Sequence, residues 1–183
     1  MPANSYVLLL RGINVGGNNR VEMSRLRAML ETMGFNNVES YINSGNVVFD
    51  AQSSPNVDDI IEHINAEFGL NIACIVLSGQ SIVRIASAIP EEWVNDSTER
   101  KSDVLYLFEK NDNPEIIKRI GHNPEIESFL YEKGAIITTI LRKHQSRGSV
   151  QKIIGTDLYK TMTVRNATTA RKLASIVGRR QKV

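Results

Sequence analysis

Arginine, asparagine and glycine are gathered in one short segment that directly follows an apolar run, Leu8–Leu10. Glycine permits backbone turns that bring N–H groups close to a ligand, and arginine adds positive charge, so the segment is suited to holding an anion. Its spacing matches neither a phosphate-binding P-loop nor a dinucleotide fingerprint. We expect the ligand contacts of this segment to come from Arg11, Asn14, Gly16, Gly17 and Asn18.

A second polar loop, Asn43-Ser44-Gly45-Asn46, separates two apolar runs and predicts a tight hairpin. Asn43, Ser44 and Asn46 are the candidate ligand-binding residues of this loop. The alternative is that both loops are structural turns, in which asparagine and serine side chains satisfy their own backbone. The residue types alone leave both interpretations open.

The remaining reactive side chains do not form a catalytic or metal-binding pattern. The three histidines are far apart in the sequence and have no cysteine or acidic residue at ligand spacing, so we expect no metal and no cofactor. Cys74 lies in an apolar run and predicts a buried thiol. Glu22 is the acid near the two loops, and we interpret it as a helix N-terminal charge rather than a general base. No catalytic residue is assigned, and the sequence does not decide whether the protein is an enzyme.

Charge is distributed unevenly along the chain. Residues 142–183 hold eleven of the 22 Lys and Arg residues and one of the 20 acids, a net charge of +10, which leaves −8 for residues 1–141. Such asymmetry is typical of proteins with a nucleic-acid or anionic partner, or of a basic end that packs against, or is solvated beside, an acidic body. Arg165 precedes Asn166, a predicted helix cap, so both are candidate phosphate contacts. Arg179 and the basic residues after it follow Gly178 and predict a mobile tail.

The order of apolar runs and turn signals predicts the same arrangement twice, strand-helix-strand-strand-helix-strand. The fold class is therefore α+β, with two tandem ferredoxin-like (α/β plait) domains, antiparallel sheets and a C-terminal helix. We expect a first domain over residues 1–77, a linking helix and loop over 78–102, and a second domain over 103–183 that includes the C-terminal helix and the basic tail. The expected strands are Tyr6–Leu10, Val38–Ile42, Val47–Phe49, Ile72–Leu77, Val104–Phe108, Ile126–Tyr131, Ala135–Leu141 and Met162–Val164.

The first expected helix carries Leu26 and Leu30, and the second begins at Ser54-Pro55. Two further helices are expected over Pro114–Ile120 and Ser149–Tyr159. In a sheet of order 4-1-3-2, the first two strands point the same way, so the loops that follow them emerge at one edge. The start of the first helix lies there too. The topology therefore predicts that the two polar loops and a positive helix end form one rim, which favours an anion.

Two blocks of the chain form a recognisable pair: Leu9-Leu10-Arg11-Gly12-Ile13-Asn14-Val15-Gly16-Gly17 and Tyr41-Ile42-Asn43-Ser44-Gly45-Asn46-Val47. Both blocks resemble the bacterial domain-of-unknown-function family 1697. Pro90-Glu91-Glu92-Trp93 and Thr163-Val164-Arg165-Asn166 resemble later elements of the family, whereas Ala167-Thr168 departs from its pattern. The resemblance implies a pair of α/β plait domains and implies no activity.

A single cysteine excludes an internal disulfide, and no apolar run approaches the ~20 residues of a membrane span, so we expect a cytoplasmic protein with no membrane association. The oligomeric state is not defined by the sequence. The favoured function is a binding module for a phosphate-bearing ligand, either a nucleotide or a nucleic acid. The alternatives are a small-molecule enzyme whose active site lies in the groove between the two domains, and a structural protein that pairs through its sheets.

Overall fold

A computed structural model describes residues 4–14, 16 and 19–180 of the protein. The chain forms two compact units. The first contains the residues up to Ile82 together with the C-terminal segment from Leu173, and the second contains Val83–Lys172. The C-terminal helix, which we expected in the second domain, is thus divided between the two units.

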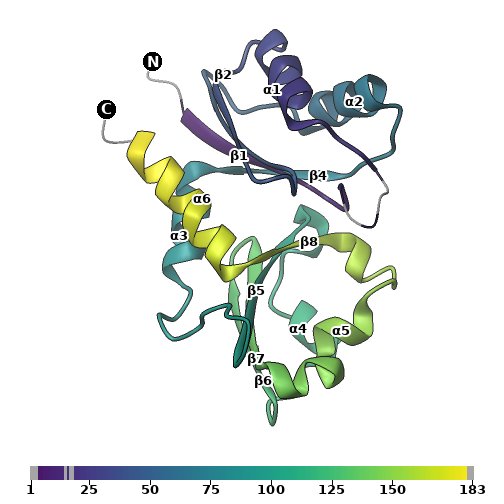
Figure 1. Ribbon diagram of the computed structural model, residues 1–183, viewed down its shortest axis with the longest axis vertical. Helices are drawn as coiled ribbons and strands as arrows, with labels where there is room; N and C mark the ends of the chain where they lie inside the picture. Colours follow the sequence, from purple (N-terminus) through teal and green to yellow (C-terminus); the bar gives the residue numbers. More distant parts are fainter. Residues whose placement is uncertain (1–3, 15, 17–18, 181–183) are drawn as a thin grey trace. The chain divides into compact units, whose positions relative to one another are not determined.

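The first unit is built on four antiparallel strands in the order β2-β3-β1-β4. The strands are β1 (Asn4–Leu10), β2 (Asn36–Tyr41), β3 (Asn46–Ala51) and β4 (Cys74–Ser78), and the helices between them are α1 (Met23–Thr32) and α2 (Val57–Phe68). Both helices lie on one side of the sheet (Figure 1). Because side chains alternate along a strand, Leu8, Leu10 and Phe49 share one face. They form a buried core with Leu26 of α1 and Ile60 of α2.

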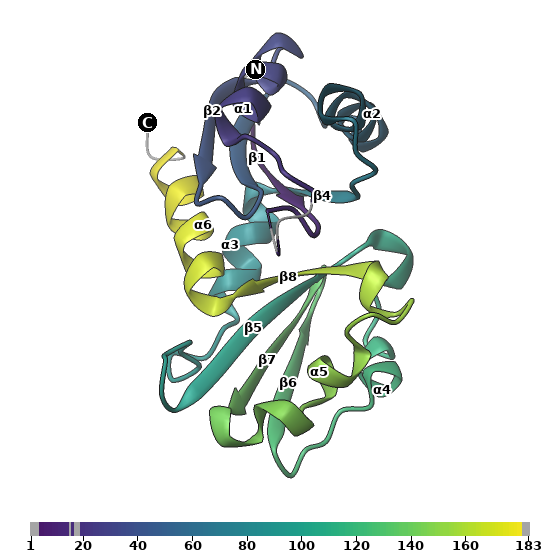
Figure 2. The ribbon, with the colours of Figure 1, turned by 45° about the vertical axis from the view of Figure 1, so that its right-hand side comes forward.

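The opposite face of this sheet is also covered. Val7, Leu9 and Val48 have no exposed surface although they point away from α1 and α2. Helices α3 (Gly79–Ser87) and α6 (Ala167–Arg180) lie side by side in both ribbon views (Figures 1 and 2). A Cβ atom built on Gly79 would lie 2.7 Å from Val177 Cγ1, so the two helices are in close contact at this point.

The second unit has its own four-stranded antiparallel sheet in the order β6-β7-β5-β8. Its strands are β5 (Arg100–Leu107), β6 (Glu127–Glu132), β7 (Ala135–Leu141) and β8 (Met162–Asn166), with helices α4 (Ile116–Ile120) and α5 (Ser149–Ile153) on one side (Figure 2). Three short 3-10 helices cover Glu109–Asn111, Arg142–Arg147 and Tyr159–Thr161. Leu105, Ile116, Ile136 and Ile153 are among the buried residues of its core. The strand order 4-1-3-2 predicted from the sequence is found in both sheets.

Several element boundaries differ from those predicted. The helix expected over Ser149–Tyr159 ends at Ile153, because Gly155 adopts a left-handed conformation with φ of 86°. Helix α2 begins at Val57 rather than at Ser54-Pro55, since the Asn56 side chain accepts a hydrogen bond from Asp58 N and caps the helix.

The hairpin after β2 begins one residue earlier than predicted. Strand β2 ends at Tyr41, and Ile42 is already left-handed, with φ of 50°. The helix predicted to begin at Pro114 begins at Ile116 and ends at Ile120, where the left-handed Gly121 follows. Each of these corrections involves a boundary and leaves the order of elements unchanged.

The predicted mobile tail is wrong for Arg179 and Arg180. Helix α6 continues through Gly178 to Arg180, and the Arg180 side chain is only 15% exposed. Its guanidinium lies 3.3 Å from Asp50 on β3 and 3.2 Å from Glu39 on β2. Lys182 lies outside the described residues. The basic end therefore packs, at Arg180, against acidic residues of the first unit, as the alternative interpretation of the charge asymmetry predicts.

Among the described residues, no helix is both long enough and apolar enough to cross a membrane.

Candidate functional site

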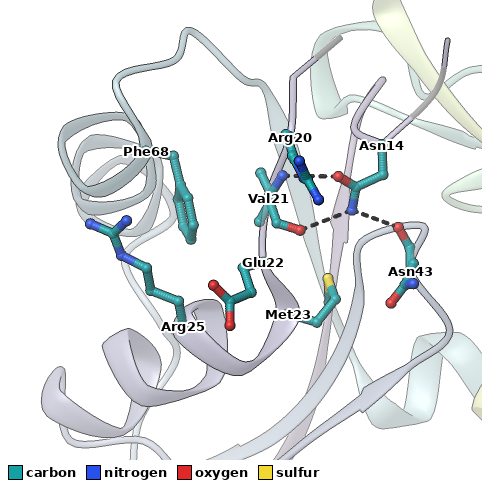
Figure 3. Close-up of a pocket in the computed structure, with 8 residues that line it drawn as sticks. All are labelled: Asn14, Arg20, Val21, Glu22, Met23, Arg25, Asn43 and Phe68. Atoms are coloured by element: carbon teal, nitrogen blue, oxygen red, sulfur yellow. Dashed lines mark hydrogen bonds between the residues drawn. The ribbon is translucent and has the colours of Figure 1, made fainter. Parts of the chain in front are cut away.

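A hollow of about 580 Å³ opens at one end of the first unit, where the segment after β1, the β2–β3 hairpin and the start of α1 meet. Its size falls within the range of small-molecule sites. Figure 3 shows the side chains around it. The lining residues are Asn14, Arg20, Val21, Glu22, Met23, Arg25, Asn43 and Phe68.

Asn14 joins the three segments that surround the hollow. Its Oδ1 accepts a hydrogen bond from Val21 N at 2.9 Å, and its Nδ2 donates to Val21 O at 2.9 Å and to Asn43 O at 2.8 Å (Figure 3). Its φ of 54° is in the left-handed region, which asparagine tolerates better than most residues. Because its amide group is used within the protein, Asn14 positions the site rather than offering donors to a ligand.

The hairpin residues also bind to their own backbone. Asn46 is fully buried, and its Nδ2 donates to Tyr41 O at 3.1 Å and to Ser44 Oγ at 2.9 Å. Leu10 N donates to Gly45 O at 2.8 Å, which fixes the hairpin to the end of β1. The structure thus brings the two predicted loops together. It also gives Asn14, Ser44 and Asn46 hydrogen bonds of the kind expected for structural turns. Asn43 is the exposed hairpin residue that lines the hollow.

The start of α1 contributes backbone donors to the same place. Leu26 N donates to Glu22 O at 3.0 Å and is the first donor of the helical ladder. The N–H groups of Met23, Ser24 and Arg25 therefore precede this ladder and carry the positive end of the helix dipole. Arg20 is exposed and also lines the hollow. The guanidinium and the N–H groups favour an anion, whereas the Glu22 carboxylate that lines the same hollow opposes one.

Only Asn14 and Asn43 of the eight described lining residues were candidate ligand-binding residues from the sequence; Arg25 and Phe68 are two of the six that were not. Arg25 forms an ion pair through its Nε with the Glu67 carboxylate, and its Nη2 donates to Glu67 O at 3.0 Å. Its Cζ lies 5.4 Å from the centroid of the Phe68 ring, a cation–π distance. The sequence places Phe68 in the apolar stripe of α2. The one signal for another role is its position at the last turn of the helix, before Gly69.

Other candidate residues are placed differently. Arg11 is half-buried directly after β1, and its backbone N donates to Ala73 O at 2.9 Å. Gly16 has a φ of 60° and no atom within 4 Å of a built Cβ. Gly17 and Asn18 lie outside the described residues.

Arg165 and Asn166 belong to the second unit, and each has a local role there. Arg165 is 7% exposed, and its Nη1 donates to Thr163 Oγ1 at 3.0 Å and to Val164 O at 2.8 Å. Burial lowers the pKa of its guanidinium to about 10, although the phenols of Tyr106 and Tyr159 oppose this shift. Asn166 Oδ1 accepts from Thr169 N at 2.8 Å, so it caps α6 as predicted. Neither residue is among the described residues that line the hollow of the first unit.

The thiol of Cys74 and the carboxylate of Glu22 have surroundings that suit a structural role. Burial, with a smaller contribution from the Asp58 charge, raises the pKa of the Cys74 thiol to about 12, so the thiol is inert as a nucleophile. No group of three or more metal-ligating side chains occurs among residues 4–14, 16 and 19–180. The carboxylate in the hollow, Glu22, accepts a hydrogen bond from Ser24 Oγ at 2.5 Å. No histidine is among the described lining residues.

These features define an α+β protein with two four-stranded antiparallel sheets and a polar hollow in its first unit. Residues 3–136 match the model of a family described as "Protein of unknown function (DUF1697)", and the chain belongs to this family. The chain is similar to a solved structure, the conserved bacterial protein SP0830 from Streptococcus pneumoniae. The TM-score is 0.78 and the identity 28%, and the match covers 96% of this chain and 99% of that one. No match is found among curated proteins.

Proposed function

We propose that the first unit is a binding module for a phosphate-bearing ligand, which sits in the hollow between the two loops and the start of α1. The observation that carries this proposal is that Arg20 and the start of α1 both line a hollow of about 580 Å³. Backbone N–H groups at a helix start and a guanidinium are the donors that phosphate oxygens prefer. We further propose that the two units are tandem ferredoxin-like domains, because both sheets have the strand order of that fold.

A small ligand is favoured over a nucleic acid by the position of the basic C-terminal residues. Arg179 and Arg180 are part of α6, and Arg180 forms ion pairs with Asp50 and Glu39. Their charges are therefore directed toward carboxylates of the same unit rather than spread along a flexible arm. Binding is favoured over catalysis because the carboxylate that lines the hollow, Glu22, is exposed and has no histidine beside it among the described lining residues.

The proposal is tested by isothermal titration of the protein with inorganic phosphate and with ribose 5-phosphate. Arg20→Ala should weaken binding of ribose 5-phosphate by about tenfold or more, because a charge-assisted hydrogen bond contributes roughly 1.5–3 kcal/mol. Arg27→Ala is the matched control. It removes the same charge from α1, but the Arg27 guanidinium donates to Ser40 Oγ and does not line the hollow.

The control variant should bind like the wild type. If the wild type binds neither phosphate compound, or if both variants lose affinity equally, the hollow is not a phosphate site.

A further inference from the structure

We propose that the ligand of this hollow is a nucleoside monophosphate whose base carries an amino group. The base stacks on Phe68, and its amino group donates a hydrogen bond to the Glu22 carboxylate. This inference rests on the proposed function, since it takes the phosphate to lie at the Arg20 side. It adds the part of the ligand that phosphate binding alone does not define.

Phe68 is held in place as a platform for a planar ring. Arg25 is fixed by two contacts to Glu67, one to the carboxylate and one to the backbone oxygen, and its guanidinium lies against the Phe68 ring. Figure 3 shows the ring with Arg25 on one side and Val21 and Glu22 on the other. Phe68 is partly buried against the core of the first unit and also lines the hollow, so we take the part of its ring that faces the hollow as the surface for an aromatic ligand. Base–aromatic stacking uses such a surface.

The Arg25 guanidinium is not the group that binds the phosphate. Its charge is offset by the Glu67 carboxylate, and its plane is engaged with Phe68. Arg20 remains as the phosphate donor, because the start of α1 lies next to the Glu22 carboxylate. The two arginines of the hollow therefore have different roles, one toward the ring system and one toward the anion.

The Glu22 carboxylate makes the two ends of the hollow chemically different. An ionised carboxylate only accepts hydrogen bonds, and one oxygen of Glu22 is already bonded by Ser24 Oγ at 2.5 Å. The carboxylate repels a phosphate but accepts from the exocyclic amino group of a base. It lies between Phe68 and Met23 in Figure 3, whereas Arg20 lies next to Val21 and Asn14. A ligand with an amino-bearing ring at one end and a phosphate at the other matches this distribution.

Cytidine and uridine monophosphates are a well-matched pair of probes, because their bases differ at one position on the edge of the pyrimidine ring. Cytosine presents an amino donor there, and uracil presents a carbonyl acceptor. Ribose 5-phosphate has the same sugar and phosphate without a base. Titration of the full chain with these three compounds and with inorganic phosphate separates recognition of the base from recognition of the phosphate.

The wild type should bind cytidine monophosphate about fivefold or more tighter than ribose 5-phosphate, which is the lower end expected for one stacked base. Phe68→Leu keeps an apolar side chain and should remove this advantage while leaving ribose 5-phosphate binding unchanged. Glu22→Gln should reduce an expected preference of about tenfold for cytidine over uridine monophosphate to near equality. Glu31→Gln is the control, because it makes the same change at an exposed position near the other end of α1.

Equal affinities of the wild type for cytidine monophosphate, uridine monophosphate and ribose 5-phosphate would overturn this inference and leave phosphate binding intact. Tighter binding of a single-stranded oligonucleotide than of any monophosphate would also overturn it, in favour of a nucleic-acid site. Absence of binding by every phosphate compound would overturn both the inference and the proposed function. Thermal unfolding of each variant separates loss of the fold from loss of binding, and Glu22→Gln tests the base preference without changing the core.

Discussion

At the scale of single residues, the candidate site depends on positions where only one residue type satisfies both the backbone and its neighbours. Gly45 is the strongest example. Its φ is 73°, and a built Cβ would lie 2.7 Å from Leu10 Cβ and 2.9 Å from Ile13 Cδ1. A side chain at this position would separate the hairpin from the end of β1, where Leu10 N and Gly45 O are bonded at 2.8 Å.

We therefore expect Gly45→Ala to lower the free energy of unfolding by about 3 kcal/mol, the combined cost of a left-handed alanine and of overpacking. Gly69→Ala is the matched control. Gly69 has a φ of 64° and no atom within 4 Å of a built Cβ, so it should cost only about 1 kcal/mol. Urea unfolding followed by far-UV circular dichroism measures both. Equal losses in the two variants would show that contact with Leu10 and Ile13 does not matter.

The residues of the site differ in how far the sequence could identify them. The two loops were predictable because glycine and asparagine at a strand end indicate turns, and the strand order places both turns at one edge. Arg25 and Phe68 were not, because their spacing on α1 and α2 resembles that of ordinary surface and core residues. Their importance arises from a contact between two helices that are distant in the sequence. The role of Asn14 was visible only as an alternative, since three hydrogen bonds to distant atoms decide it.

At the scale of elements, α6 shows how a charged residue fixes a helix to a sheet. Asp50 on β3 accepts hydrogen bonds from Ser5 Oγ at 2.6 Å and from Asn37 Nδ2 at 2.8 Å, in addition to its contact with Arg180. Burial raises the pKa of the Asp50 carboxyl, but these hydrogen bonds and the Arg180 charge together hold the pKa below its ordinary value. The carboxylate therefore stays ionised and remains a partner for the end of α6.

Arg180→Gln should lower the free energy of unfolding by roughly 1–3 kcal/mol, because it leaves a partly buried carboxylate without its cation. Arg179→Gln should change it by less than about 0.5 kcal/mol, since the Arg179 side chain is 64% exposed and 4.0 Å from Glu39. The two adjacent arginines thus form a matched pair for denaturant unfolding. A loss of similar size in both variants would mean that net charge, rather than the contact with Asp50, stabilises α6.

At the scale of the whole molecule, the two units repeat a set of backbone contacts that the sequence does not show. In the first unit, Leu10 N donates to Gly45 O and Arg11 N donates to Ala73 O. In the second unit, the residues at the same places make equivalent bonds: Leu107 N donates to Gly134 O at 2.9 Å, and Phe108 N donates to Thr161 O at 3.0 Å. Backbone atoms make these bonds, so the residue types can differ: the first bond joins leucine and glycine in both units, whereas Phe108 and Thr161 stand in place of Arg11 and Ala73.

The repeat extends to one polar side chain in each unit. Asp112, in the segment after β5, accepts from Gly134 N at 2.7 Å, much as Asn14 donates to Asn43 O in the first unit. The side chains around these shared contacts differ. Phe108 occupies the place of Arg11, and a 3-10 helix, Glu109–Asn111, replaces the glycine-rich segment. The two units thus share a scaffold, and the cationic loop belongs to the first.

This difference predicts that a ligand stabilises only one unit. In hydrogen exchange measured by mass spectrometry, saturating cytidine monophosphate should slow exchange at Arg20–Arg25, in the hairpin around Asn43 and at the end of α2 around Phe68. Exchange in β5, β7 and β8 should be unchanged, because ligand binding stabilises only the segments whose opening it opposes. Arg20→Ala is the control, and its exchange should not respond to the nucleotide. Protection in both units would favour the alternative in which an enzyme active site requires residues from each, since a site confined to the first unit cannot slow local opening in the second.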